Sequence, residues 1–315
     1  MNADGWHGLE IRHLVTLRAI AEHGSFGAAA GALGYSQSAV SQQVATLERI
    51  VGAPLFDRLG GRRAVRLTDH GSLLVRHGDA MLARVQAAQA DFAALEAGGS
   101  GPLTVGVYQS VGARLLPDLM REFGRRHPDV EIRLREAVSD REAWQLLACG
   151  AADVSFTMLP VDEDGVEAVE VLSDPYVLLV AAASPLAARA GTPSVDELAA
   201  LPLVCFRSCR NEHRIEAQLR ARGLEPDIVF RSDDNATIQA LVAADYGAAL
   251  MPRLTVDLAD ARVHAVALDG LFAPRSLGIG WHRDRHRQPA VRAFIDLARK
   301  LCPVIAEHHA ATLRP

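Results

Sequence analysis

Apolar residues at helical spacing near the start of the chain predict two short helices. Within residues 37–51, four of them follow the spacing i, i+4, i+7 and i+11, which places them on one helix face. Ser25 and Ser36 each precede a helical segment, where a serine hydroxyl accepts from a free backbone N–H. Gly34 ends the first segment, residues 26–33, because glycine adopts the left-handed turn that closes a helix. The face positions are Val40, Val44, Leu47 and Val51. This is the pattern of a helix-turn-helix.

The opposite face of the second helix is polar, and it is the candidate DNA-reading surface. Short polar side chains can donate to and accept from base edges in a major groove. The residues at or beside this face are Ser36, Gln37, Ser38, Ser41, Gln42 and Arg49. On spacing alone, an ordinary helical hairpin with a solvated face remains the alternative.

An arginine-rich segment follows the two helices. Gly60-Gly61 is the predicted turn of a β-hairpin wing, and residues 62–67 are one of its arms. Arginines of such a wing contact phosphate, which positions a protein on DNA without reading sequence. The candidates are Arg58, Arg62 and Arg63. A solvated run of charge is the alternative.

Two further helices frame this region. Residues 9–23 form the first, and a long helix from Asp69 to Ala97 follows the capping Thr68. Apolar positions in the long helix alternate spacings of four and three, which is typical of a coiled-coil seam. About 28 residues span roughly 42 Å, more than a small three-helix domain covers, so the pattern favours pairing with a second chain. The predicted dimer contacts are Leu74, Met81, Val85, Ala88, Phe92 and Leu95, with Gly78 the seam position that lacks a side chain.

Beyond Gly98–Pro102, a predicted hinge, strand and helix patterns alternate. Alternating strands are expected at 103–108, 130–137 and 153–158, with helices between them, which indicates a parallel α/β sheet. A second unit of the same kind follows. Its expected strands include LVCF, DIVFRS and AALM, its helices are expected at 195–200, 212–222 and 236–244, and a last helix spans 290–306.

Composition sets the class of protein. The chain has 315 residues, too many for one ordinary domain, with 49% hydrophobic and 23% charged residues and a net charge of −5. That charge argues against non-specific coating of nucleic acid but allows a local basic surface. No run approaches the roughly 18 apolar residues of a membrane span, and the N-terminus lacks the pattern of a secretory signal, so we expect a cytoplasmic protein.

The stretch AxxLGYSQSAVSQQVATLERIVGAPLFDR, followed by RLTDHG, resembles the N-terminal domain of the LysR-type transcriptional regulators. The resemblance is strong over residues 11–71. One departure is Gly27-Ala28, where the family often has a polar residue that reaches phosphate. The matching residues are Ala29, Ala30, Leu33, Ser36, Gln37, Ser38, Val40, Ser41, Leu47, Glu48, Gly52, Leu55, Phe56, Arg58, Thr68 and Gly71.

The resemblance implies the whole architecture. A winged helix-turn-helix would cover residues 1–67, a linker and dimerisation helix 68–97, a hinge 98–102, and an effector-binding domain 103–315. That last domain would resemble periplasmic binding proteins, with lobe I at about 103–180 and 283–308, lobe II at about 181–282, and two strands crossing between them. The implied partners are double-stranded promoter or operator DNA, a small-molecule effector and a second copy of the chain, as a homodimer or homotetramer.

Open α/β sheets bind ligands at the carboxyl ends of their strands. Each residue at such an end can equally be a helix cap or a loop contact. Family members hold small effectors, often carboxylates, in the cleft between these ends. The candidates here are Gln109, Ser110, Ser139, Asp140, Thr157, Cys205, Phe206, Arg207 and Asp234.

Four cysteines show neither a disulfide framework nor paired metal-ligand spacing. Cys205 and Cys209 lie near Arg207 and Arg210, which can lower a thiol pKa, so a redox-responsive regulator is one alternative. The histidine pair His282/His286 is better explained as a solvated connection than as a metal site. No nucleophile elbow, P-loop or dinucleotide motif is present, so neither an enzyme nor a cofactor is expected. The other alternative is a solute-binding module with secondary DNA binding.

Overall fold

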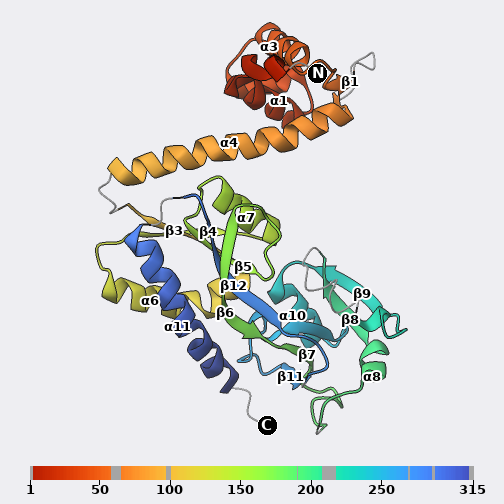
Figure 1. The fold of residues 1–315 in the computed structure, drawn as a ribbon. Coiled ribbons are helices and arrows are strands. Elements are labelled where there is room, and N and C mark those ends of the chain that lie inside the picture. The colour runs from red at the N-terminus through yellow and green to blue at the C-terminus, as the bar shows by residue number, and fades with distance from the viewer. Residues whose placement is uncertain are drawn as a thin grey trace. The chain divides into compact units, whose positions relative to one another are not determined.

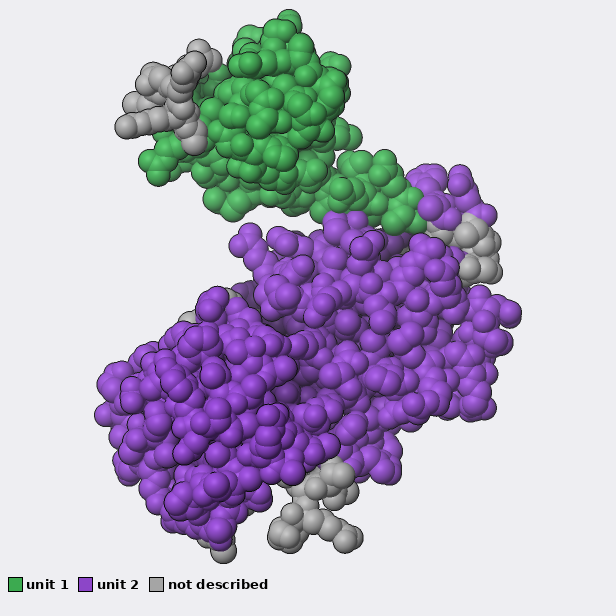
Figure 2. All heavy atoms as spheres, turned by 180° about the vertical axis from the view of Figure 1, so that it is seen from behind, with its two compact units in different colours: residues 1–90 green, residues 91–315 purple. Residues whose placement is uncertain are grey.

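The computed structural model describes residues 3–57, 65–96, 101–189, 191–207, 218–268, 270–285 and 288–311. The chain forms two compact units, Met1–Ala90 and Asp91–Pro315, which Figure 2 shows in green and purple. Within those described ranges, no helix is both long and apolar enough to cross a membrane. The units are considered in turn.

Unit 1 is built on three helices, and their ends follow the local sequence signals. A short 3-10 helix, η1 (Ala3–Gly8), precedes α1 (Ile11–His23), α2 (Phe26–Leu33) and α3 (Gln37–Val51). The hydroxyls of Ser25 and Ser36 accept from the N–H groups of Ala28 and Ala39. The predicted bounds of α2 and α3 are confirmed, and α1 begins two residues later than expected.

The predicted wing is described only at its base. Strands β1 (Phe56–Asp57) and β2 (Arg66–Leu67) pair antiparallel, so the hairpin is confirmed there. The predicted arm at 62–67 is described from Val65, and its strand is Arg66–Leu67. Arg58, Arg62, Arg63 and the turn Gly60-Gly61 lie outside the described residues.

The long helix α4 (Asp69–Glu96) begins against the base of the wing. The Thr68 hydroxyl donates to the Pro54 carbonyl and accepts from the Gly71 N–H, as the cap prediction requires. A Cβ at Gly71 would lie 2.1 Å from the Leu55 carbonyl oxygen, so only glycine fits this approach. Gly78 likewise faces Leu14 of α1.

The predicted dimer seam needs one correction. Leu74 is 3% exposed and belongs to the core of unit 1 with Leu14, Val40 and Leu47, because the first turns of α4 pack on their own domain. It therefore drops out of the predicted partner contacts. Along the rest of the seam, Met81, Ala88 and Phe92 are exposed in the single chain and Val85 is half-buried, whereas the side chain of Leu95 lies outside the described part.

Unit 2 contains a mixed five-stranded sheet, in the order β4-β3-β5-β12-β6. We name this sheet and its helices lobe I. Strands β3 (Leu103–Val107), β4 (Ile132–Glu136) and β5 (Val154–Met158) are parallel, as expected, but β12 (Arg275–His282) runs antiparallel to β5 and to β6 (Val166–Asp174). The parallel arrangement expected for the first three strands is thus confirmed. The sheet as a whole is mixed, because a strand that returns from the other lobe enters from the opposite end.

Helices cover both faces of this sheet (Figure 1). Helices α5 (Gln109–Arg114), α6 (Leu116–Arg126) and α11 (Pro289–Ala311) share one core with it, where the rings of Phe123 and Phe294 meet edge to face at 5.3 Å. On the other face lies α7 (Asp140–Ala148), whose Leu147 contacts Gly280 of β12. The alternating pattern read from the sequence thus gives the right elements.

Lobe II contains two smaller sheets. Strands β10 (Ala249–Pro252), β7 (Tyr176–Ala181) and β11 (Val263–Ala267) pair antiparallel, and β8 (Pro202–Phe206) pairs parallel with β9 (Asp227–Ser232). A parallel bridge between Leu203 and Ala248 links the two sheets. The described part of the lobe also contains helix α8 (Val195–Ala199), helix α10 (Asn235–Ala243) and the 3-10 helix η2 (Arg253–Thr255). Most of the helix expected at 212–222 lies outside the described residues, as do 98–100 of the predicted hinge and Ala97, the predicted end of the long helix.

Two crossings join the lobes, as the family resemblance implied. The chain leaves lobe I after β6 and returns at β12. The predicted lobe boundaries at 181 and 282 are each wrong by one strand, because β7 pairs within lobe II and β12 within lobe I. Asp174 and Arg275, the residues at the two crossings, are register partners.

Candidate functional site

Helix α3 presents a polar face to solvent and an apolar face to the core of unit 1. Val40, Val44 and Leu47 are buried, and Val51 packs at the core margin. On the opposite face all candidate side chains are exposed, namely Gln37, Ser38, Ser41, Gln42 and Arg49. The structure therefore brings together on one surface the residues that spacing predicted.

Two residues of α3 and its cap hold the helix in place. The hydroxyl of Ser36 caps the helix and lies 2.9 Å from the Ser38 hydroxyl, so both of these contacts are made within the start of α3. The side-chain oxygen of Gln43 accepts from the hydroxyl of Thr16, which is buried in α1. Sequence reasoning missed this anchor because Gln43 is one of two adjacent glutamines and only Gln42 faces outward.

A cavity of about 680 Å³ lies between the two lobes of unit 2. This volume suits a small organic ligand. Six of the nine residues predicted from strand ends line it: Gln109, Ser110, Ser139, Asp140, Phe206 and Asp234. The rule that ligands bind beyond the carboxyl ends of parallel strands thus leads to this cavity.

A buried ion pair lies at one wall of the cavity, where the two crossings meet. The Arg275 guanidinium donates to one Asp174 carboxylate oxygen from Nη2 at 2.6 Å and from Nε at 3.0 Å. The other carboxylate oxygen accepts from the Leu254 N–H at 3.1 Å, and the Arg275 Nη2 lies 3.4 Å from the Ser110 hydroxyl. The two side chains of the pair are 5% and 3% exposed. Arg275 lines the cavity, so the same group supports the crossing and the wall.

A second pair of bonds fixes the aromatic wall. The Tyr108 hydroxyl donates to Asp140 Oδ1, and burial, together with the charge of Asp140, raises the pKa of Tyr108 far above its usual value. The Trp144 indole N–H donates to the Thr157 hydroxyl at 2.7 Å. Tyr108, Trp144 and Phe206 bring aromatic rings to the cavity from both lobes.

One residue bridges the lobes across the cavity. The Gln109 amide donates from Nε2 to Asp234 Oδ1 at 2.9 Å, and its Oε1 accepts from the Asn235 N–H at 3.2 Å. Asp234 also caps α10 by accepting from Thr237. These bonds, from Thr237 first and then from Gln109, lower the pKa of Asp234 to about 2. The bridge joins the start of α5 to the start of α10.

Three predicted effector residues lie away from the cavity. Thr157 is fully buried, and its hydroxyl is taken by Trp144. Cys205 packs at the margin of the lobe II core, because alternation along β8 turns it from the cleft that Phe206 faces. Arg207 turns its guanidinium to the Arg231 carbonyl. The redox alternative stays untested, since Cys209 lies outside the described residues.

The cavity is also lined by residues outside the predicted set. Tyr108 and Asp233 stand at strand ends that the sequence indicated, although only their neighbours were chosen as candidates. Arg275 gave no such signal, because its partner Asp174 is 101 positions away. The charged or aromatic lining residues that sequence reasoning missed are, besides Arg275, Glu136, Arg141, Trp144 and Asp162.

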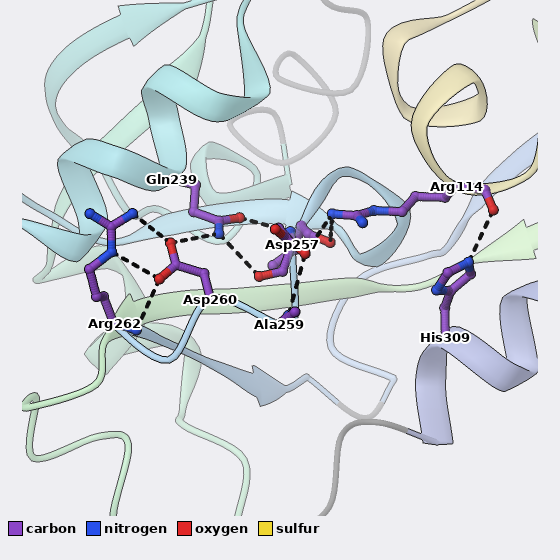
Figure 3. A network of polar contacts seen from close by, with 8 residues as sticks. Arg114, Gln239, Asp257, Ala259, Asp260, Arg262 and His309 are labelled. Atoms are coloured by element: carbon purple, nitrogen blue, oxygen red, sulfur yellow. Dashed lines mark hydrogen bonds and ion pairs between the residues drawn. The ribbon is translucent and has the colours of Figure 1, made fainter. Parts of the chain in front are cut away.

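A second polar network joins the lobes on the other side of α5 (Figure 3). Arg114, at the end of α5, binds the Val256 carbonyl at 3.2 Å and the Asp257 carboxylate at 3.1 Å. The Gln239 side chain accepts from the Asp257 N–H and donates to Asp260, whose pKa is lowered mainly by its bond to Arg262. Both ends of α5 are therefore bonded to lobe II.

Comparison with known proteins identifies both parts of the chain. A family model described as the LysR substrate binding domain matches residues 96–303, and a model described as a bacterial regulatory helix-turn-helix protein of the lysR family matches residues 11–72. The two matches together cover both units.

Relatives match over nearly their full length. A probable RuBisCO transcriptional regulator of Trichormus variabilis is 31% identical over 288 residues, which are 88% of this chain and 84% of the relative. A probable hydrogen peroxide-inducible genes activator of Mycobacterium avium is 30% identical over 305 residues, 94% of each chain. A solved structure of full-length CbnR complexed with its target DNA has the same fold, with a TM-score of 0.62, 22% identity, and coverage of 93% of this chain and 99% of CbnR.

Proposed function

Because this chain belongs to the LysR family of transcriptional regulators, we propose that the cavity of unit 2 binds the small molecule that controls its action on DNA. The protein is a DNA-binding transcriptional regulator and not an enzyme. The proposal concerns which residues perform each part of that function and where.

On the DNA side, the proposed contacts come from α3 and the wing. Gln42 and its neighbours on the exposed face would read base edges, and Arg58, Arg62 and Arg63 would contact phosphate. A cytoplasmic location is part of the proposal, and the DNA-binding family of unit 1 supports it. The exposed seam residues Met81, Ala88 and Phe92 support pairing of two chains along α4, as a homodimer or homotetramer.

The observation that carries the effector proposal is the Gln109 bridge. Its two bonds link α5 to α10 at the rim of the cavity, and both Gln109 and Asp234 line it. A ligand that contacts both lobes must adapt to this bridge or replace it. Ligand occupancy is thereby coupled to the angle between the lobes, which supplies the two states that allosteric control requires.

The test is binding by a wild-type chain and two serine variants. A thermal-shift screen of small molecules identifies a ligand, because binding only to the native state raises the melting temperature. Ser110→Ala is expected to weaken that ligand by about 0.5–1.5 kcal/mol for one neutral hydrogen bond, without altering ligand-free DNA affinity. Ser173→Ala, at an exposed serine that does not line the cavity, is the matched control.

Calorimetric titration measures the affinity for the ligand, and DNA footprinting measures how the ligand changes the binding to DNA. We expect the ligand to change the footprint of the wild type, with the Ser110→Ala variant needing more ligand for the same change. Equal affinity in all three proteins would remove Ser110 from the site. A footprint that stays the same at saturating ligand would refute control through this cavity.

A further inference from the structure

The cavity between the lobes is lined by more negative than positive side chains. Five of its lining residues are acidic and two are arginines. The acidic ones are Glu136, Asp140, Asp162, Asp233 and Asp234, and the basic ones are Arg141 and Arg275. This balance bears on the chemistry of the ligand, since charges in a cleft with low-dielectric walls act on a ligand more strongly than they do in water.

Of the two arginines that line the cavity, the buried one, Arg275, is already neutralised by an ion pair with Asp174. Arg275 makes two donor contacts to Asp174 at 2.6 and 3.0 Å, and both side chains are almost fully buried. A ligand carboxylate beside Arg275 would be the second anion for a single guanidinium. It would lose its water without gaining a net opposite charge, which is unfavourable for an ion.

The start of the short helix α5 carries no acidic residue, but the starts of α10 and α7, which also line the cavity, carry the chain's own acidic groups. Asp234 caps α10 and accepts from the N–H groups of Ala236 and Thr237. Ser139 caps α7, and Asp140 occupies its first turn. The positive ends of these helix dipoles are thus already matched to protein carboxylates rather than left for a ligand anion.

The apolar part of the lining suits a cation. Aromatic rings of Tyr108, Trp144 and Phe206 come to the cavity from both lobes, and aromatic faces attract organic cations. Asp140 adds a carboxylate that is only 8% exposed, and Tyr108 orients it through a hydroxyl bond. Trp144 is itself held by Thr157. A built wall of rings and a fixed carboxylate therefore lies in a cavity of about 680 Å³.

Resting on the assignment of this cavity as the effector site, we propose that it takes a small organic cation, a protonated or quaternary amine on an apolar body. The apolar body would lie among the rings, and the nitrogen would face the acidic side chains. This differs from the carboxylate effectors that the family resemblance led us to expect.

The test compares probes of similar shape and different charge. The probes are phenethylamine, trimethylphenylammonium, phenylacetate and 2-phenylethanol. Each is titrated into the full chain at low salt, with saturation-transfer NMR to detect millimolar binding and calorimetry to measure it. We expect the cations to bind roughly fivefold or more tightly than the carboxylate and the alcohol, which corresponds to about 1 kcal/mol for one ion pair.

Variants that remove a charge from an exposed lining residue should change the affinity for a cation in opposite directions, according to the sign of the charge removed. Glu136→Gln and Asp162→Asn should each weaken phenethylamine roughly two- to fivefold, and Arg141→Gln should tighten it by a similar factor. These three residues are solvent-exposed, so the substitutions leave the core intact. Glu163→Gln, next to Asp162 but outside the lining, is the matched control and should change nothing.

Three results overturn the proposal: phenylacetate that binds as tightly as phenethylamine, variants whose effects have the reverse signs, or no binding by either cation at millimolar concentration. The regulatory assignment fails separately. Cation binding with the expected signs but an unchanged DNA footprint would keep the ligand class and refute control of DNA. A carboxylate that binds in the cavity and changes the DNA footprint would refute the cationic ligand class and keep the control of DNA binding by this cavity.

Discussion

The two surfaces proposed for function differ in how they relate to the fold. On α3, the exposed side chains of Gln42 and Arg49 lie opposite the apolar stripe, and the core of unit 1 is formed without them. Around the cavity, Arg275, Tyr108 and Gln109 line the wall and also bond other parts of the chain to one another. On the proposed assignment, the residues for recognition and those for stability are separate in unit 1, whereas in unit 2 the same bonds serve both.

The largest expected effect tests the unit 2 side of this contrast. Asp174→Ala leaves the Arg275 guanidinium buried without its main partner, so we expect a loss of about 3–5 kcal/mol in the free energy of unfolding. Asp164→Ala removes an ion pair of similar length, but its two side chains are 51% and 100% exposed, so about 0–1 kcal/mol should be lost. Chemical unfolding followed by circular dichroism measures both. Equal losses would show that the crossing does not depend on this pair.

The second prediction tests separability in unit 1 with two adjacent glutamines. Gln42→Ala should cost about 1–3 kcal/mol of specific DNA binding. Its free energy of unfolding should stay within about 0.5 kcal/mol of wild type, because Gln42 is a surface residue. Gln43→Ala should do the opposite, since it leaves the buried Thr16 hydroxyl without its acceptor, at about 1–3 kcal/mol of stability. Gel shifts on cognate and random DNA, beside unfolding curves, decide between them; matching profiles for the two variants would break the contrast.

The smallest expected effect concerns the dependence of stability on pH. It tests a residue of unit 1 that contributes to stability and is not part of the proposed DNA-reading face. The ring nitrogen Nδ1 of His13 accepts from the Glu10 N–H at 3.1 Å, and burial lowers the pKa of His13 below its usual value of 6.5. A folded-state pKa below the unfolded one means that stability is fully present above about pH 6.5 and is lost as pH falls through the folded-state pKa.

His13→Asn keeps an acceptor but does not titrate. Relative to this variant, the wild type should lose stability when the pH is lowered from about 7.5 to about 5.5, the interval that brackets the histidine reference value. Urea unfolding midpoints of the full chain at each pH provide the measurement. Parallel pH profiles for the two proteins would show that folding does not lower the pKa of His13.

Local signals explain why so much of unit 1 was predictable. Ser25, Gly34 and Ser36 act on their nearest neighbours, and each stands at the end of the helix that it was expected to bound. The strands of unit 2 were predicted to within about three residues for the same reason. The direction of β12 was not, because it depends on where the chain returns after more than ninety residues in the other lobe.

The cavity shows the same limit. Strand ends predicted Ser110 and Asp140 because the position of a strand end is a local property. Thr157 also lies at a strand end, but it does not line the cavity. Its hydroxyl accepts from the Trp144 indole N–H inside the lobe. Arg275 contributes to the wall only through a partner 101 positions away, and no short window of sequence contains both residues.

The close approach at Gly71 has a consequence for genetics. A side chain there would meet the Leu55 carbonyl oxygen at 2.1 Å, so any missense change displaces the start of α4 from the base of the wing. A selection for loss of promoter binding would recover alleles at this codon alongside those on α3. If such alleles were mapped as nucleic-acid contacts, the interface would be misplaced. Gly71 has no side chain to contact DNA, and its substitution disturbs the packing between α4 and the base of the wing.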